Sequence, residues 1–241
     1  MNDPLPPVLY ERHDDGVAVI TLNRPEKKNA INLEMARLIQ TYLQQAEQDD
    51  AIQAIVLTGH PEVFSAGMDI KAFRQGELPV VEPEGFGGIV HAQLAKILIA
   101  AVDGMAFGGG FEIALACDLI VANRSARFSF PETGLGLIAA QGGCSRLPAR
   151  ISPYVALDWL LTGRLITAEE AWQHGAISRI SEGSAREEAL SVARQIAHKS
   201  PLASQAVKAI VRHGLTQHEA PTFDYQQAWV EQARHAATKF F

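Results

Sequence analysis

One glutamate of the chain follows three consecutive glycines, in FGGGFE at 107–112, and the apolar run IALACDLIVA comes directly after it. Glycine inside a helix or strand costs up to about 1 kcal/mol relative to alanine, so three consecutive glycines beside an apolar run require a structural or functional reason. A strand that ends in a glycine turn and opens a helix presents free N–H groups at the positive end of the helix dipole, where an anion or a developing oxyanion can bind. The segment therefore predicts a strand, an anion-binding turn and a helix with Glu112 in its first turn. A tight turn packed under another element is the structural alternative.

Two further segments combine a turn with an acidic residue. FSAGMDI at 64–70 follows a predicted strand, and FSFPETGLG at 128–136 places Glu132 directly after a proline. A lone glutamate such as Glu132 is more often a loop or helix-start carboxylate than a catalyst. Neither segment, taken singly, decides between a structural loop and a site.

The sequence lacks several common active-site motifs. Residues 108–113 read GGGFEI, so GxGxxG is not matched, and neither a GxxxxGK[ST] phosphate loop nor a GxSxG elbow occurs. Eight histidines occur without HExxH, so we expect no metal site. A serine–histidine nucleophile stays open, although nothing in the sequence points to one.

The elements around these segments alternate between strands and helices. Apolar, β-branched runs predict strands at 16–23, 54–59, 96–104 and 118–122, and Asn32 is placed to cap an amphipathic helix over 33–48. This order predicts an α/β fold with helix-covered sheets. The stretch 97–122 is apolar enough for a membrane span, but acidic residues and glycines interrupt it, so we interpret it as buried core.

From about residue 153 the pattern becomes largely helical. Capping-box spacings begin at Thr167, Ser184 and Thr216, while Gly175 and Gly214 stand where helices are expected to stop. We therefore divide the chain into a core with the active site, 1–152, and a helical C-terminal region, 153–241, of one functional domain. The apolar residues assigned to the core or to subunit contacts in this region are Trp159, Leu160, Trp172, Val211 and Trp229.

Composition excludes some classes of partner. The 241 residues carry a net charge of −6, and 47% are hydrophobic, which indicates a globular protein that binds neither nucleic acid nor a membrane surface. Cys117 and Cys144 form no CxxC motif, and the N-terminus has neither an apolar segment nor a basic leader. We therefore expect free thiols and a cytoplasmic protein.

Five segments together resemble the crotonase (enoyl-CoA hydratase/isomerase) superfamily, in its order and spacing. This resemblance implies an α/β, ClpP-like fold of repeated ββα units with a helical C-terminal region for oligomerisation, as a homotrimer or dimer of trimers. GFGG at 85–88, followed by AFGGGFE, is most similar to the carnitinyl-CoA dehydratase-like branch. The matching segments are 23–32, 57–73, 100–122, 128–137 and 161–178.

The resemblance assigns roles to individual residues. The backbone N–H groups of Met68 and Gly109 are implied donors to the thioester oxygen, and removal of one such donor typically costs roughly 3–4 kcal/mol of barrier. Glu112 and Glu132 match the two catalytic glutamates, which can share one water and move its protons. Retention of both glutamates favours an enoyl-CoA hydratase or dehydratase over an isomerase.

The resemblance also implies contacts with coenzyme A, which enters as part of the substrate, so we expect no separate cofactor. The segment 72–93 is the expected wall of the acyl pocket, with Phe73 and Phe86 as its apolar side chains. The residues matching coenzyme A contacts are Ala66, Asp69 and Ile70, with Lys27 and Lys28 for phosphates. The alternatives are that Asp69 organises its own turn and that the two lysines are solvated surface charges.

Two departures from the family pattern bear on the site. AAQGG at 139–143 replaces the proline-glycine of many hydratases, and Gln141 is expected to reshape the pocket near the acyl group. The chain also stops at Phe241, before the basic segment that often ends this family, so we expect truncation or a different contact with coenzyme A. The alternatives to a hydratase are a Δ3,Δ2-enoyl-CoA isomerase and a non-catalytic acyl-CoA-binding member.

Overall fold

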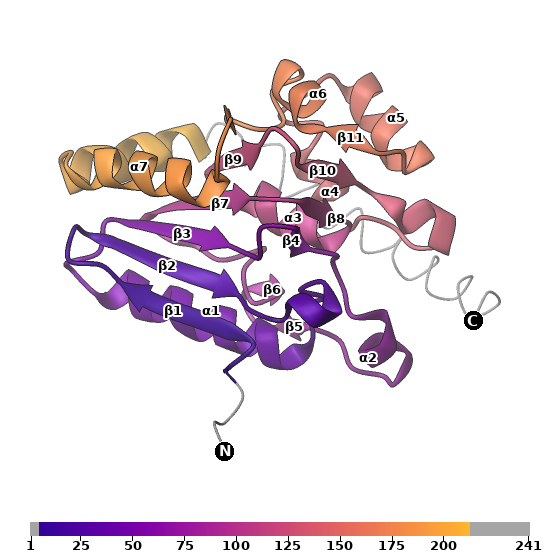
Figure 1. Cartoon of the computed structure of the whole chain (residues 1–241), viewed down its shortest axis with the longest axis horizontal. Coiled ribbons are helices and arrows are strands. Elements are labelled where there is room, and N and C mark those ends of the chain that lie inside the picture. The colour runs from indigo at the N-terminus through magenta and orange to yellow at the C-terminus, as the bar shows by residue number, and fades with distance from the viewer. Residues whose placement is uncertain (1–4, 213–241) are drawn as a thin grey trace.

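The computed structural model describes residues 5–212, and a six-stranded sheet forms the middle of this part of the chain (Figure 1). Its strand order is β1-β2-β3-β7-β9-β12, and every neighbouring pair except β1 with β2 is parallel. The strands are β1 (Val8–Arg12), β2 (Val17–Leu22), β3 (Ala54–Thr58), β7 (Ile97–Val102), β9 (Leu119–Asn123) and β12 (Arg179–Ser181).

A second, four-stranded sheet has the order β11-β10-β8-β4, with β4, β8 and β10 parallel and β11 antiparallel to β10. A separate pair of short strands, β5 and β6, is antiparallel. These strands are β4 (Val63–Ser65), β5 (Val80–Val81), β6 (Gly85–Phe86), β8 (Met105–Phe107), β10 (Arg127–Ser129) and β11 (Ile166–Thr167).

The helices connect the two sheets in a repeating order. Three times the chain passes from the larger sheet to the smaller sheet and then into a helix: β3-β4-α2, β7-β8-α3 and β9-β10-α4. The predicted repetition of ββα units is therefore confirmed. The helices are α1 (Leu33–Gln48), α2 (Ile70–Arg74), α3 (Gly109–Ala116), α4 (Gly143–Arg146), α5 (Pro153–Thr162), α6 (Ala168–Gln173) and α7 (Ala185–Ala197), with 3-10 turns η1 (Pro25–Lys27) and η2 (Pro131–Leu135) and a further helix over 201–212.

Successive side chains along the strands of the larger sheet point to opposite faces, and this alternation divides the core into two layers. Ala54 and Val56 of β3 pack with α7, whereas Ile55 and Leu57 pack with α1 and α3 on the other face. Figure 1 shows α7 lying along β3 and β7. All five residues of β3 are buried, as expected of a parallel strand covered on both faces.

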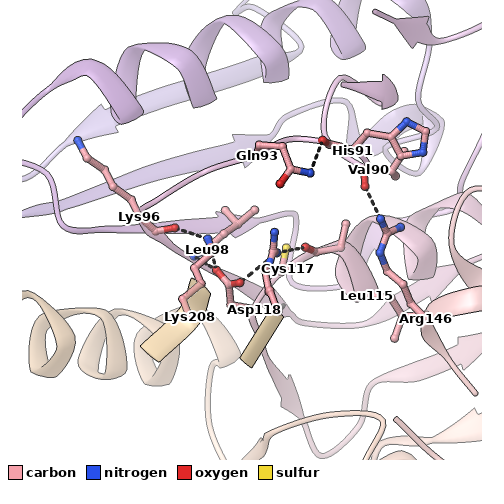
Figure 2. A network of polar contacts seen from close by, with 12 residues as sticks. Val90, His91, Gln93, Lys96, Leu98, Leu115, Cys117, Asp118, Arg146 and Lys208 are labelled. Atoms are coloured by element: carbon pink, nitrogen blue, oxygen red, sulfur yellow. Dashed lines mark hydrogen bonds and ion pairs between the residues drawn. The ribbon is translucent and has the colours of Figure 1, made fainter. Parts of the chain in front are cut away.

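The helix over 201–212 is attached to the body by an ion network around Asp118. Lys208 Nζ lies 2.7 Å from Asp118 Oδ2 and donates to the Lys96 carbonyl oxygen at 2.6 Å, and Arg212 Nη2 lies 3.0 Å from Asp118 Oδ1. Figure 2 shows Lys208 between Lys96 and Asp118. Asp118 lies two residues after the end of α3, and Arg212 Nη2 also donates to the Ala116 carbonyl oxygen at 3.2 Å, so this helix is fixed beside the C-terminal end of α3.

Most of the predicted elements are confirmed. The four predicted strands are β2, β3, β7 and β9, and Asn32 caps α1 by accepting the Met35 N–H at 3.0 Å. The stretch 97–122 forms β7, β8, α3 and part of β9, so it is core, and no helix within residues 5–212 is long and apolar enough to span a membrane.

The C-terminal region agrees with its prediction in part. Thr167 and Ser184 accept the backbone N–H groups of Glu170 and Glu187, and Gly175 adopts φ +84° after α6. The region is not helical throughout, because β11 and β12 extend the two sheets. Trp159 is buried, whereas Trp172 and Val211 are exposed. The predictions for Gly214, Thr216 and Trp229 lie outside the described residues.

Candidate active site

The triple glycine allows the start of α3 to pack directly against the end of β4. Gly108 adopts φ +51° and donates its N–H to the Ser129 carbonyl oxygen at 2.9 Å, while its own carbonyl accepts from Glu112 N at 3.0 Å. A Cβ on Gly110 would lie 2.3 Å from the Ser65 carbonyl oxygen. Side chains are therefore excluded at this turn, and the predicted strand, turn and helix are confirmed as β8, Gly108 and α3.

Two backbone N–H groups converge where β4 and β8 end. Gly67 adopts φ +90°, and a Cβ on it would lie 2.9 Å from Gly109 N. Within residues 5–212, neither the Met68 N–H nor the Gly109 N–H donates to a protein acceptor, and both residues line the same cavity. The Ser65 hydroxyl fixes this turn, since it accepts the Gly67 N–H at 3.1 Å and donates to the Asn29 carbonyl oxygen at 2.8 Å.

Glu112 points from the first turn of α3 into a cradle of backbone donors. Its Oε1 accepts the N–H of Gln141 at 2.7 Å and the N–H of Gly143 at 2.9 Å. The residue is 3% exposed, and burial raises the pKa of its carboxyl to about 7, although the N–H groups of Gly143 and Gln141 and the charge of Arg146 act in the opposite direction.

Glu132, in η2, lines the same cavity, but no comparable set of backbone N–H donors within residues 5–212 holds its carboxyl. Its Oε2 is buried without a hydrogen-bond partner among the described residues. Burial, followed by the charge of Glu112, raises the pKa of its carboxyl to about 8. Since the two carboxyls repel when both are ionised, the pair loses its protons in two steps, and the N–H donors favour Glu112 as the group that ionises first.

The cavity has a volume of about 180 Å³ and is mainly apolar apart from the two glutamates and Gln141. Phe73 and Phe86 lie in its lining, as predicted for the acyl-pocket wall. Such a lining suits a hydrocarbon chain with a few polar groups that orient it. The other apolar side chains are those of Met68, Ile70, Leu78, Pro79, Val80, Pro131, Leu135, Leu137, Ile138, Ala66 and Ala140.

The residues predicted to contact coenzyme A are only partly brought together. Ala66 and Ile70 line the cavity, whereas Lys27 and Lys28 are exposed on or beside η1 and lie outside its lining. The Lys28 carbonyl oxygen accepts the Ala66 N–H at 2.9 Å, which ties the two segments together. The contacts of these residues with coenzyme A stay predictions.

Asp69, the fifth of these residues, organises its own turn. Its Oδ1 accepts the N–H groups of Lys71 and Ala72 at the start of α2, and its Oδ2 lies 2.9 Å from Arg24 Nη1. The hydrogen bonds to Ala72 and Lys71 and the pairing with Arg24 outweigh burial and hold the pKa of its carboxyl below the usual range.

Sequence reasoning missed the groups that hold the two turns in place. Gln141 lines the cavity, as its departure from the family pattern predicts. The sequence does not predict that the N–H groups of Gln141 and Gly143 bind Glu112, because backbone donors leave no residue-type signal. Asn29 adopts φ +50°, and its Nδ2 donates to the carbonyl oxygens of Val63 and Phe64. The position of Asn29 in a polar loop does not predict these hydrogen bonds. Within residues 5–212, no group of three or more His, Cys, Asp or Glu side chains is arranged to hold a metal ion.

Comparison with known proteins identifies the family. The family model described as enoyl-CoA hydratase/isomerase matches residues 12–239. The chain belongs to this family. Its relatives in the enoyl-CoA hydratase/isomerase family include a carnitinyl-CoA dehydratase of Salmonella heidelberg (strain SL476), which is 40% identical over 209 residues, covering 85% of this chain and 80% of the relative.

Solved structures of the family have the same fold. A carnitinyl-CoA dehydratase from Mycobacterium avium 104 superposes with a TM-score of 0.90 at 39% identity, covering 95% of this chain and 92% of that chain. An enoyl-CoA hydratase from Mycobacterium tuberculosis H37Rv gives a TM-score of 0.85 at 40% identity, covering 94% and 89%. The predicted crotonase fold and the similarity to the carnitinyl-CoA dehydratase-like branch are therefore confirmed.

Proposed function

We propose that the protein is an enoyl-CoA hydratase or dehydratase, a hydro-lyase that reversibly adds water across the 2,3 double bond of an enoyl-CoA thioester. One observation carries this proposal: Glu112 and Glu132 line the same cavity as the Met68 and Gly109 N–H groups, which have no protein acceptor within residues 5–212. An acid, a base and two oxyanion donors are the groups that the reaction requires.

The thioester oxygen is bound by the N–H groups of Met68 and Gly109. Attack on C3 moves electron density onto this oxygen and forms an enolate. Two fixed donors, one at the start of a helix, stabilise the new negative charge without reorganising. Because Gly109 is buried at the start of α3, water competes little for its N–H group.

The two glutamates move the protons. In hydration, the Glu112 carboxylate accepts a proton from the attacking water as the water oxygen bonds to C3. The Glu132 carboxylic acid donates its proton to C2 as the enolate collapses. The carboxyl with two N–H donors is thus the base, and the carboxyl without a partner at Oε2 is the acid. Dehydration runs the same steps in reverse.

No step is assigned to a metal or a redox cofactor, and coenzyme A enters as part of the substrate. The acyl group lies against the apolar lining that includes Phe73 and Phe86. Coenzyme A follows the segment around Ala66 and Ile70, with its phosphates toward Lys27 and Lys28. Since two of the relatives reported above are named carnitinyl-CoA dehydratases, the enoyl thioester formed by dehydrating carnitinyl-CoA is one substrate to test beside crotonyl-CoA.

The assay follows the loss of conjugated enoyl absorbance and the formation of 3-hydroxyacyl-CoA in the same reaction. Matching rates for the two signals support a hydratase. Conversion of a 3-enoyl-CoA into a 2-enoyl-CoA without any hydroxyacyl product would establish the isomerase alternative. Binding of enoyl-CoA without turnover of any substrate would indicate the non-catalytic alternative.

The protein is proposed to form a homotrimer or a dimer of trimers in the cytoplasm. The exposed apolar surface on α5, on α6 and in the connection between them supports the assembly. The free thiols of Cys117 and Cys144 support the cytoplasmic location. Light scattering that shows a stable monomer at micromolar concentration would contradict the assembly. The exposed apolar residues are Tyr154, Leu157, Leu161, Leu165 and Trp172.

A further inference from the structure

Arg146, in α4, lies against the loop that holds Glu112. Its Nη1 donates to the Gln141 carbonyl oxygen at 3.1 Å. A Cβ on Gly142 would come within 2.2 Å of the same nitrogen, so glycine at 142 leaves the room that the guanidinium occupies. Gln141 and Gly143, the two donors to Glu112, stand on either side of this contact. The guanidinium thus braces the segment that presents both N–H groups.

The other end of the guanidinium reaches the segment that follows Phe86, a residue of the cavity lining. Arg146 Nη2 donates to the Val90 carbonyl oxygen at 2.5 Å, a contact drawn in Figure 2. Val90 is buried, and its N–H bonds back to the carbonyl oxygen of Phe86, whose side chain lines the cavity. One side chain therefore joins the cradle of Glu112 to the wall that contacts the acyl group. The Gln141 and Val90 carbonyl oxygens that it joins are 51 residues apart in sequence (141 − 90).

Few charged or titratable groups act on Glu112 among the described residues. Glu132 approaches from η2, and Cys144 and Arg146 approach from α4. Arg146 is the cation of this set. A positive charge close to a buried carboxyl favours its ionised form, opposing both burial and the second glutamate.

We propose that Arg146 is a positioning residue for the base: it holds the segment 139–143 so that two N–H groups face Glu112. Where it concerns turnover, this inference rests on the proposed hydratase function. Arg146 is not among the residues that line the cavity. It acts through the segment that holds Glu112 and through Val90, which is bonded to Phe86.

Arg150 provides a matched control. It has the same residue type and a similar partial burial, and its Nη2 donates to the carbonyl oxygens of Leu115 at 2.7 Å and Cys117 at 3.3 Å. These acceptors lie at the C-terminal end of α3, whereas Glu112 lies in its first turn. Replacement of Arg150 thus removes a half-buried arginine and its contacts with carbonyl oxygens at the other end of α3.

The first experiment compares pH profiles of kcat/KM for hydration of crotonyl-CoA. For Arg146→Met, we expect the maximum of kcat/KM to fall by at least about tenfold. The acid limb of its pH profile should move upward by roughly one pH unit, the size expected for loss of a nearby unlike charge. For Arg146→Lys, which keeps the charge, the acid limb should stay in place while kcat/KM falls less. Arg150→Met should leave the limb where it is in the wild type.

The second experiment needs no turnover, so it separates this inference from the proposed function. In a Glu132→Gln background, isotope-edited infrared spectra follow carboxyl titration, and subtraction of the Glu112→Gln/Glu132→Gln spectrum isolates Glu112. Adding Arg146→Met should raise the midpoint by roughly one pH unit, and adding Arg146→Lys should not. This result would support the positioning role even if the wild type hydrates no enoyl-CoA.

An unchanged Glu112 midpoint in folded Arg146→Met protein would overturn the inference. If that variant does not fold, Arg146→Lys decides: a midpoint raised as far as charge removal predicts would also overturn it. A lowered melting temperature with an unmoved acid limb, for Arg146→Met as for Arg150→Met, would show a purely structural role.

Discussion

The backbone of Gly67 lies against that of Gly109, so close that a Cβ on Gly67 would come within 2.9 Å of Gly109 N. The two residues are 42 positions apart (109 − 67), yet their segments carry the two N–H groups assigned to the thioester oxygen. The spacing of these donors is therefore set by contact between two backbones. A single methyl group is enough to change it.

We expect Gly67→Ala to lower kcat by about 10²-fold or more, the usual cost of losing one oxyanion donor. The added methyl meets Gly109 N and, at 2.8 Å, the Phe107 carbonyl oxygen, and φ +90° is strained for alanine. Steady-state hydration of crotonyl-CoA measures the effect. Gly183→Ala is the control, since a Cβ there meets nothing within 4 Å. Wild-type kcat in folded Gly67→Ala protein would show that Gly109 does not donate to the substrate.

The dependence of hydration on pH should be bell-shaped. Below the raised pKa of Glu112, about 7, this carboxyl is protonated and cannot accept a proton from water. Above the raised pKa of Glu132, about 8, the acid has lost the proton that it must donate. The value of kcat/KM, which reports on the free enzyme, should therefore rise and then fall between about pH 5 and pH 10. A rate that is already maximal at pH 5 would contradict these roles.

Some of this architecture follows from residue types that act locally. The start of α1 was predicted because Asn32 caps the helix with its own side chain. Strand β3 was predicted because a short apolar run bounded by polar residues suits a strand covered on both faces. The turn at Gly108 was predicted for the same kind of reason, since consecutive glycines have a local physical cost.

The features that were missed depend on contacts between distant segments. Strands β11 and β12, of two and three residues, are too short to show a period, and they form only because a neighbouring strand edge is present. The Arg24–Asp69 ion pair joins residues 45 apart, and Arg146 reaches Val90 across 56 residues. No spacing rule within one segment specifies such pairs.

Replacement of Glu132 by glutamine should stabilise the folded protein at alkaline pH while reducing its activity. Because folding raises the pKa of Glu132 to about 8, the folded state binds this proton more tightly than the unfolded state, so stability falls as pH rises from the ordinary carboxyl range through about 8. Glutamine stays neutral and avoids this loss.

The melting temperature of Glu132→Gln should equal that of the wild type near about pH 4 and exceed it by several degrees near about pH 9, since about 2–4 °C corresponds to 1 kcal/mol for a chain of this size. Calorimetry in a series of buffers measures the difference. Glu62→Gln, at an exposed position, is the control. A margin that shrinks as pH rises would show that folding does not raise the pKa of Glu132.

The last prediction distinguishes a hydratase from an isomerase through both glutamates. Glu112→Gln keeps an oxygen that can accept from Gln141 and Gly143, and Glu132→Gln keeps the size of the side chain, so both variants should fold. Each loses a group that moves protons, a role typically worth about 10²–10⁴ in rate, and each should therefore slow hydration of crotonyl-CoA by at least about 10²-fold.

The double variant should be little slower than the slower single variant, because residues that act together as one catalytic unit share their contribution. An isomerase depends on one carboxylate and tolerates replacement of the other. If Glu112→Gln hydrates crotonyl-CoA within a few-fold of the wild type while Glu132→Gln abolishes isomerisation of a 3-enoyl-CoA, the two-carboxylate mechanism is wrong. The same cavity and oxyanion donors would then serve a proton shuttle between C2 and C4, with Glu132 as its single acid and base.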